Sequence, residues 1–203
     1  MQPTLAIESL AGHRDFRALA SIPGVAIDLR YATPGNFVGA DMYSPFDCAW
    51  LHNDAAAMLE RTAQALARRD RGLRILVLDA LRPQRVQERM WKALEGTPLT
   101  QYLADPARGS IHSFGMAVDV TIVDEAGREL DMGTGFDDLT ELSHPALEEG
   151  FLARGDLHER HVANRSLLRE VMAESGWRGI RTEWWHFDGG DRERIRAQYL
   201  RIL

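Results

Sequence analysis

The chain has 203 residues, with 24 Lys or Arg against 30 Asp or Glu, so its formal net charge at pH 7 is −6. Its 45% hydrophobic and 27% charged residues are typical of one globular domain with a sizeable core, and they exclude disordered, collagen-like and coiled-coil chains. Because the negative balance gives no long-range attraction for a phosphate backbone, we expect no nucleic-acid partner.

The N-terminal segment predicts neither a signal peptide nor a membrane anchor, because it carries Glu8 early and has no apolar stretch longer than Leu5-Ala6-Ile7. Elsewhere no apolar run approaches the roughly 18 residues that a membrane helix needs. We therefore expect a cytoplasmic protein with no membrane partner. The single cysteine, Cys48, excludes an intrachain disulfide and a thiolate-rich zinc site, so a metal ion would need His and carboxylate ligands.

A short strand is predicted from Val25 to Arg30, where apolar and polar residues alternate. The next segment, residues 31–46, is punctuated by Pro34-Gly35 and Gly39 and is predicted to be a loop. Loops of this length in compact domains are more often functional than idle. We therefore interpret residues 31–39 as a candidate wall of a functional site.

A helix is predicted to begin at Asn53. Its apolar stripe consists of Ala56, Leu59, Ala63 and Leu66. Residues 73–78 are predicted to form a buried strand. Pro83 disfavours helical geometry at Arg82 but suits the first turn of a following helix, so residues 84–94 are predicted to be helical. Arg82 is thereby placed at a strand-to-helix junction.

The remaining elements are mixed in type. Residues 115–123 alternate and predict a strand with Asp119 on the face shared by the small Ala117. The others are a short partner strand near residues 129–132, helices at residues 162–175 and 192–202, and a strand-like segment at residues 182–187. Because there is no regular βαβ rhythm, we expect one α+β domain over residues 1–203, with a central, largely antiparallel sheet flanked by helices.

Two imidazoles and two carboxylates lie in two segments, residues 110–119 and 183–186. His112 and Asp119 are seven residues apart, so they share a face only if the chain bends between them, and Gly115 permits that bend. Three ligands from His112, Asp119 and His186 would leave a fourth tetrahedral position open, as in catalytic zinc sites. The alternative interpretation of such a His and Asp pair is an ordinary surface hydrogen bond.

Two further residues complete a candidate reaction centre. Glu183 is the spare carboxylate and a candidate general base. Arg82 is a candidate for stabilising an oxyanion, although an Arg before Pro is by default an ion-pair partner, here of Asp79. The chemistry that these residue types favour is metal-assisted amide hydrolysis.

Four dispersed segments carry a family resemblance. They are Tyr31-Ala-Thr33 with Asn36-Phe37-Val-Gly39, then Arg82-Pro83, then Ser110-x-His112-x-x-Gly115-x-Ala117-x-Asp119, and finally Glu183-x-Trp185-His186. In these segments and their order the sequence resembles the zinc D-alanyl-D-alanine dipeptidases, the VanX-type branch of the D,D-peptidase metallopeptidases. Phe114 stands where some resistance-type members of that family have an Arg.

The resemblance implies a D,D-peptidase/hedgehog-like fold and one zinc ion per chain, bound by His112, Asp119 and His186. It implies Glu183 as catalytic base and Arg82 as transition-state stabiliser. Tyr31, Ser110 and Asp137 match positions that line the substrate pocket in the family. The implied reaction is hydrolysis of the free dipeptide D-Ala-D-Ala to two D-alanines, in a vancomycin resistance-like role or in D-alanine salvage.

Two alternatives remain open from the sequence. The first is a related zinc D,D-carboxypeptidase or peptidoglycan endopeptidase acting on longer wall peptides. The second is a non-catalytic binding module of the same fold with a structural zinc ion, against which the presence of both Glu183 and Arg82 argues. The oligomeric state has no signature in the sequence.

Overall fold

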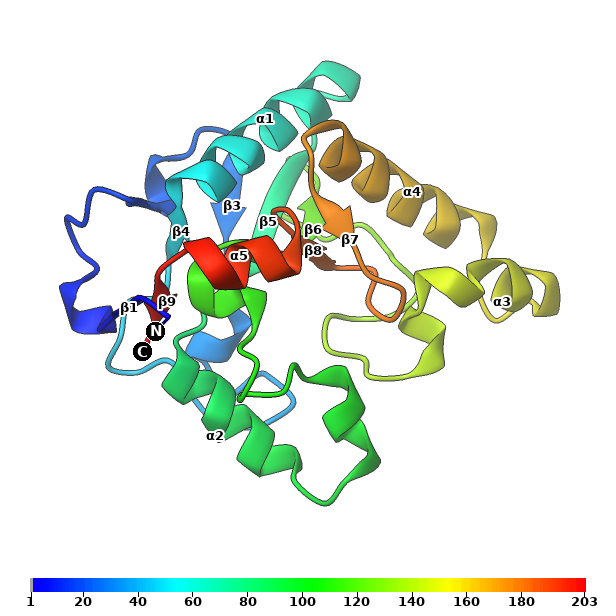
Figure 1. The fold of residues 1–203 in the computed structure, drawn as a ribbon. Helices are drawn as coiled ribbons and strands as arrows, with labels where there is room; N and C mark the ends of the chain where they lie inside the picture. Colours follow the sequence, from blue (N-terminus) through cyan, green and yellow to red (C-terminus); the bar gives the residue numbers. More distant parts are fainter. Residues whose placement is uncertain (1) are drawn as a thin grey trace.

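A five-stranded sheet forms the centre of the protein (Figure 1). The computed structural model describes residues 2–203. In spatial order the strands are β3 (Val25–Ile27), β5 (Arg74–Asp79), β6 (Ala117–Val123), β8 (His186–Asp188) and β7 (Arg178–Gly179). β3 and β5 pair in parallel, and the other neighbours pair antiparallel. The predicted α+β class with a central, largely antiparallel sheet is thereby confirmed.

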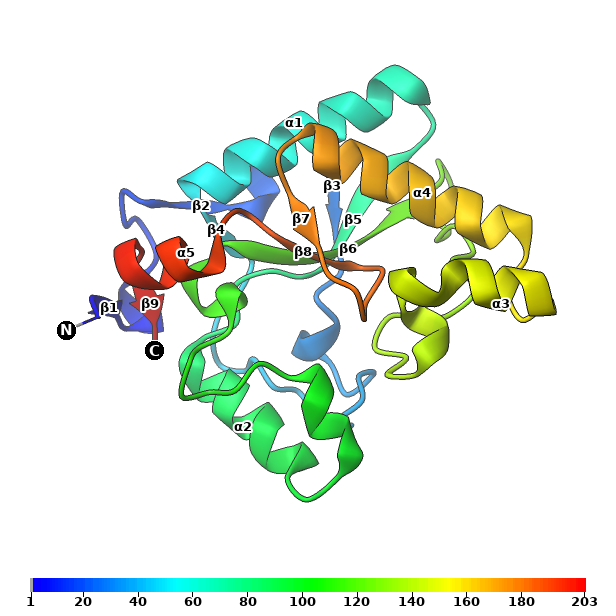
Figure 2. The ribbon, with the colours of Figure 1, turned by 45° about the vertical axis from the view of Figure 1, so that its right-hand side comes forward.

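Two smaller sheets lie outside the central one. β2 (Phe16–Ala18) pairs antiparallel with β4 (Trp50–His52). β1 (Thr4–Leu5) pairs in parallel with β9 (Arg201–Ile202). The β1–β9 pair brings the two ends of the described chain together, as Figures 1 and 2 show.

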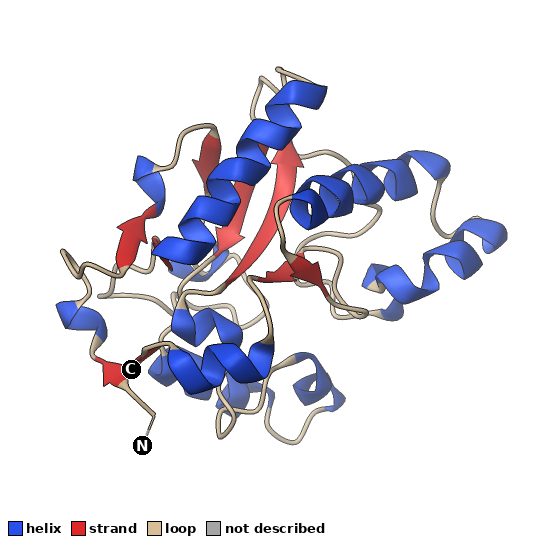
Figure 3. Cartoon of the chain, turned by 45° about the horizontal axis from the view of Figure 1, so that its top comes forward, coloured by secondary structure: helices blue, strands red, loops and turns tan. Residues whose placement is uncertain are grey.

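Helices lie on both sides of the central sheet. They are α1 (Asn53–Arg69), α2 (Gln84–Leu94), α3 (Glu148–Arg154), α4 (Glu159–Glu174) and α5 (Arg192–Gln198). α1 and α4 contact each other and lie over one face of the sheet, whereas α2 lies on the opposite side (Figures 2 and 3). Within residues 2–203, the structure has no helix of the length and apolar character that crossing a membrane requires.

The main hydrophobic core lies between the sheet and the pair α1 and α4. It contains, among others, Leu59 and Leu66 of α1, Ile75 and Val77 of β5, Val118, Val120 and Ile122 of β6, and Leu168, Val171 and Met172 of α4. Because side chains alternate along a strand, Asp119 lies between Val118 and Val120 but points to the other face. All residues of β6 are buried, so this carboxylate is also enclosed by protein.

The structure corrects several predicted elements. The strand predicted from Val25 to Arg30 ends at Ile27, and Arg30 begins a 3₁₀ helix. The last helix ends at Gln198, because Tyr199 takes extended backbone and residues 201–202 pair with β1. In the segment 182–187, the strand begins only at His186. The predicted strand at residues 129–132 is reduced to one bridge between Val123 and Glu129. The ends of α5 and β8 depend on pairing with β1 and β6, which lie far away in the sequence, and local periodicity does not show those partners.

Candidate metal centre and active site

His112 is placed by a short 3₁₀ helix, Ile111–Phe114. The hydroxyl of Ser110 caps this helix by accepting a hydrogen bond from the His112 amide, at 3.3 Å. Gly115 ends it in the left-handed conformation with φ of 61°. A Cβ at this position would lie 2.8 Å from the backbone nitrogen of His52, so only glycine fits. The predicted bend at Gly115 is confirmed.

Asp119 and His186 are brought together by strand register. They are direct cross-strand partners in the antiparallel pair β6–β8, so their side chains lie on the same face of the sheet. His186 is the first residue of β8, and Glu183 therefore lies in the loop before the strand. His112 reaches the same point from its 3₁₀ helix.

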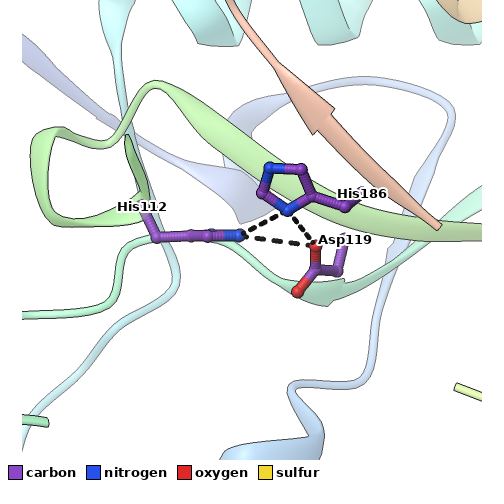
Figure 4. A group of neighbouring side chains, drawn as sticks. All are labelled: His112, Asp119 and His186. Atoms are coloured by element: carbon purple, nitrogen blue, oxygen red, sulfur yellow. Dashed lines mark hydrogen bonds and ion pairs between the residues drawn. The ribbon is translucent and has the colours of Figure 1, made fainter. Parts of the chain in front are cut away.

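The three side chains converge on one point, as Figure 4 shows. Nδ1 of His186 lies 2.9 Å from Oδ1 of Asp119, and Nε2 of His112 lies 3.2 Å from that same Nδ1. One donor atom from each residue lies within 4.8 Å of the other two. All three side chains are nearly inaccessible to solvent.

The outward-facing nitrogens of both imidazoles are fixed by hydrogen bonds. Nδ1 of His112 lies 2.7 Å from the carbonyl oxygen of Ala80, which can only accept, so this nitrogen carries the proton. Nε2 of His186 donates in the same way to Oδ1 of Asp188, at 3.1 Å, and Arg192 donates to the other oxygen of Asp188 at 2.6 Å. Nε2 of His112 and Nδ1 of His186 are consequently the nitrogens that face inward, and each can serve as a metal ligand when it carries no proton.

The charges of this cluster suit a cation. Burial opposes a charged carboxylate at Asp119, but His112 and His186 lower its pKa below the ordinary value. Burial likewise opposes a charged imidazole at His186, yet Asp188 and Asp119 raise the pKa of His186 well above its usual range. Two imidazoles and one carboxylate are the ligand types of catalytic zinc sites, so the residues present fit a zinc ion.

The cluster lies on the wall of a cavity of about 250 Å³. The predicted base and oxyanion stabiliser, Glu183 and Arg82, line the same cavity, as do the three predicted substrate-pocket residues, Tyr31, Ser110 and Asp137. Tyr31 and Phe37 come from the loop that the sequence analysis interpreted as a wall of the site. The structure therefore gathers all eight predicted site residues around one enclosed space.

Glu183 is half-buried, and the loss of solvent around its carboxyl raises the pKa to about 7. The nearby charges act in both directions, because His186 and Arg82 lower this pKa whereas Asp119 raises it. A carboxyl with a pKa near neutrality is suited to take up a proton in one step and to release it in the next.

Arg82 lies at the junction between β5 and α2, as predicted, and its guanidinium is 7% exposed. Its Nε and Nη2 both donate to Oδ2 of Asp79, at 2.9 and 2.5 Å, and Nη2 lies 3.5 Å from Oδ2 of Asp119. Arg82 therefore forms the ion pair with Asp79 that the sequence suggested as an alternative role. It also lines the cavity. Asp79 also accepts a hydrogen bond from the hydroxyl of Tyr43.

Asp137 offers an unpaired oxygen at the cavity. The hydroxyl of Tyr31 donates to Oδ1 of Asp137 at 2.9 Å, whereas Oδ2 is buried and has no hydrogen-bond partner within residues 2–203. Burial raises the pKa of Asp137 well above its ordinary value. Its backbone φ of 60° is uncommon for a non-glycine residue. A buried acceptor without a partner is the kind of group that a cationic ligand satisfies.

Several residues around the cavity were missed by sequence reasoning. Arg192 and Arg196, in the helix predicted at residues 192–202, were not predicted as site residues, but both line the cavity. Asp188, which holds His186, was not singled out, although residues two apart on a strand share a face and that spacing points to it. Residues 101–104 also line the cavity, and no local pattern marks them.

Comparisons with known proteins agree with this geometry. A family model described as D-ala-D-ala dipeptidase matches residues 13–202. The chain is 38% identical over 166 residues to a D-alanyl-D-alanine dipeptidase of Escherichia coli K12, covering 82% of this chain and 79% of that protein. It is 31% identical over 184 residues to the same-named protein of Enterococcus faecium, covering 82% and 86%. A solved LD-carboxypeptidase structure is more distant, with 14% identity, 94% and 80% coverage and a TM-score of 0.48.

Proposed function

The chain belongs to the D-Ala-D-Ala dipeptidase family of metallopeptidases, and from that premise we propose that it uses one zinc ion to hydrolyse D-Ala-D-Ala to two D-alanines. One observation carries the proposal. The donor atoms of His112, Asp119 and His186 converge on the wall of a cavity that also contains Glu183 and Arg82. A metal-ligand set, a candidate base and a fixed cation thus face the same enclosed space.

His112 through Nε2, His186 through Nδ1 and Asp119 through its carboxylate would hold the zinc ion. A zinc ion in such a site supplies Lewis acidity toward water and toward an amide carbonyl. The hydrogen bonds from His112 to Ala80 and from His186 to Asp188 keep the two ligand nitrogens turned inward.

Glu183 moves the proton. Its carboxylate takes a proton from the attacking water and then gives that proton to the nitrogen of the departing D-alanine. The raised pKa of Glu183, about 7, supports both directions of transfer near neutral pH.

Arg82 stabilises the negative charge that develops on the former carbonyl oxygen. Its guanidinium is buried, and Asp79 holds it through two hydrogen bonds. The group is therefore already oriented before the reaction, and little free energy is needed to reorganise it in the transition state. Asp79 and the neighbouring tyrosines outweigh the effect of burial and raise the pKa of Arg82, so the charge is always present.

The substrate is held by its own ammonium group. The free Oδ2 of Asp137 accepts a hydrogen bond from that ammonium. The hydroxyl of Tyr31 orients the carboxyl group of Asp137 by donating to its Oδ1. Ser110 lines the cavity at the 3₁₀ helix that carries His112. The cavity, at about 250 Å³, falls below the roughly 300–1,000 Å³ of pockets for drug-sized ligands, which favours a substrate as small as a dipeptide.

The test is release of D-alanine by zinc-loaded protein from three substrates: D-Ala-D-Ala, L-Ala-L-Ala and a pentapeptide that ends in D-Ala-D-Ala. Each is assayed with and without a chelator. We expect chelator-sensitive release from the free D,D-dipeptide and far less from the other two. Preference for the pentapeptide would replace the proposal with a carboxypeptidase, and release that ignores the chelator would remove the metal from the mechanism.

A further inference from the structure

Gln87 lies on α2 with no exposed surface. Both the oxygen and the nitrogen of its side-chain amide form hydrogen bonds with residues that line the cavity. Oε1 accepts a hydrogen bond from Nη1 of Arg82 at 3.1 Å, and Nε2 donates to the carbonyl oxygen of Ala104 at 2.8 Å. One buried side chain therefore connects Arg82 to another segment that lines the same cavity.

We call residues 101–106 the strap. Its first two residues end a 3₁₀ helix, Pro98–Tyr102, its residues 101–104 line the cavity, and it leads toward Ser110. Side chains from α2 hold this segment: Gln87 binds the carbonyl of Ala104, and Gln84 donates to the carbonyl of Pro106 at 3.0 Å. At its other side, the hydroxyl of Tyr102 lies 3.2 Å from Nε2 of His144.

The strap determines which end of the Gln87 amide faces Arg82. A carbonyl oxygen can only accept, so the contact with Ala104 must use the NH₂ group of Gln87. The oxygen of the same planar amide then faces the guanidinium. Without the Ala104 contact the amide is free to flip, and its NH₂ group would meet the N–H groups of Arg82, donor against donor.

Gln87 also holds the one end of the guanidinium that Asp79 leaves free. Asp79 binds Nε and Nη2, and Gln87 binds one of the two hydrogens on Nη1. The remaining N–H on Nη1 is available to a ligand, because arginine has five N–H donors. Gln87 is neutral, so it fixes the plane of the guanidinium without reducing the positive charge that the reaction uses.

We propose that Gln87 is a positioning residue that couples the strap to Arg82. When the strap packs against Gln87, the Gln87 amide is fixed, and the guanidinium of Arg82 takes its reactive orientation. The proposal rests on the proposed function, since it is through Arg82 that Gln87 affects turnover. A substrate enclosed by the strap thereby meets a correctly oriented cation, whereas an open strap leaves Arg82 with one support fewer.

Two substitutions separate the two contacts of Gln87. Gln87→Leu removes both. Gln87→Glu keeps an acceptor for Arg82 but places a carboxylate oxygen against the carbonyl of Ala104. The matched control is Gln84→Leu, which removes a strap anchor on the same helix without touching Arg82. The readouts are kcat and KM for D-Ala-D-Ala and hydrogen–deuterium exchange of residues 101–106.

We expect strap exchange to rise about fivefold in all three variants, the effect of one lost hydrogen bond. We expect kcat to fall about tenfold or more in Gln87→Leu, because Arg82 is misaligned, and to recover in part in Gln87→Glu, whose carboxylate orients the guanidinium but offsets its positive charge. Gln84→Leu should change mainly KM. Unchanged kcat in Gln87→Leu with faster strap exchange would reduce Gln87 to a strap anchor and overturn the proposal.

Equal loss of kcat in Gln87→Leu and Gln87→Glu with unchanged strap exchange would also overturn it. The exchange experiment needs no turnover. If the unsubstituted protein released no D-alanine, the proposed function would fail, while the exchange data would still report whether Gln87 holds the strap.

Discussion

The protein contains two buried clusters of charged side chains, and they differ in where their hydrogen bonds end. In the cluster around Arg165 of α4, the guanidinium donates to the carbonyls of Met132 and Leu142, to Thr134 and to Glu148. Glu148 also accepts from Arg169, at 2.9 Å. All these contacts end on groups of the protein itself. In the metal centre, by contrast, donor atoms of three residues and an oxygen of Asp137 face a cavity.

The two buried arginines also differ in how their surroundings shift the pKa, although both guanidinium groups stay charged. Burial lowers the pKa of Arg165, and the nearby Glu148 only partly offsets that effect. Around Arg82, Asp79 and the neighbouring tyrosines outweigh burial and raise the pKa. Arg165 connects residues 132–134, Leu142 and the start of α3, whereas the charge of Arg82 lies beside a space that a ligand can enter. Buried charge alone therefore does not mark an active site, but buried charge directed into a cavity does.

The largest expected effect comes from removing a ligand on the cavity side. We expect His186→Ala to lose zinc and to lose activity by about 10⁴-fold. Without the zinc ion, no Lewis acid activates the water from which Glu183 takes its proton. Metal content by elemental analysis and D-alanine release measure the two losses. Full zinc content in this variant would show that His186 is not a ligand.

Glu183→Gln tests the role of the carboxylate that lies beside the ligand cluster. We expect the variant to keep its zinc, because Glu183 is outside the ligand cluster, and to lose roughly 10²- to 10⁴-fold in kcat, because no carboxylate takes up the proton. The measurements are metal content and kcat at pH 7. Nearly full turnover would rule out Glu183 as the base.

Arg165→Met tests the other cluster. Because it leaves Glu148 buried with only Arg169 as partner, we expect the free energy of unfolding to fall by about 3 kcal/mol. Urea unfolding measures the loss, and kcat per folded molecule should stay close to that of the unsubstituted protein. A large fall in kcat with unchanged stability would contradict the division into a structural and a reactive cluster.

The smallest expected effect is that of Asp188→Asn. This substitution keeps the size of the side chain but weakens the support of Nε2 in His186, so we expect zinc affinity to fall about 10- to 100-fold. Competition with a zinc-binding dye measures the change. Activity at saturating zinc should be largely retained, and a variant that binds zinc as tightly as the unsubstituted protein would show that Asp188 does not tune the site.

The sequence predicted the residues whose role depends on local chain geometry. Pro83 set the start of α2 and thereby the junction at Arg82, and Gly115 set the bend between His112 and Asp119. Gln87 and Arg165 gave no such signal. Gln87 is a helix residue whose partner Ala104 lies 17 positions away, and Arg165 binds carbonyl groups whose location depends on loop conformation.

The register of β6 against β8 has a consequence for folding. Asp119 and His186 are 67 positions apart in the chain, yet they would share one ion. A bound zinc ion would thus act as a cross-link that closes this chain segment into a loop and removes conformational freedom from the unfolded state. The ion would then stabilise the fold as well as serve the chemistry, and thermal unfolding with and without chelator would measure that second contribution.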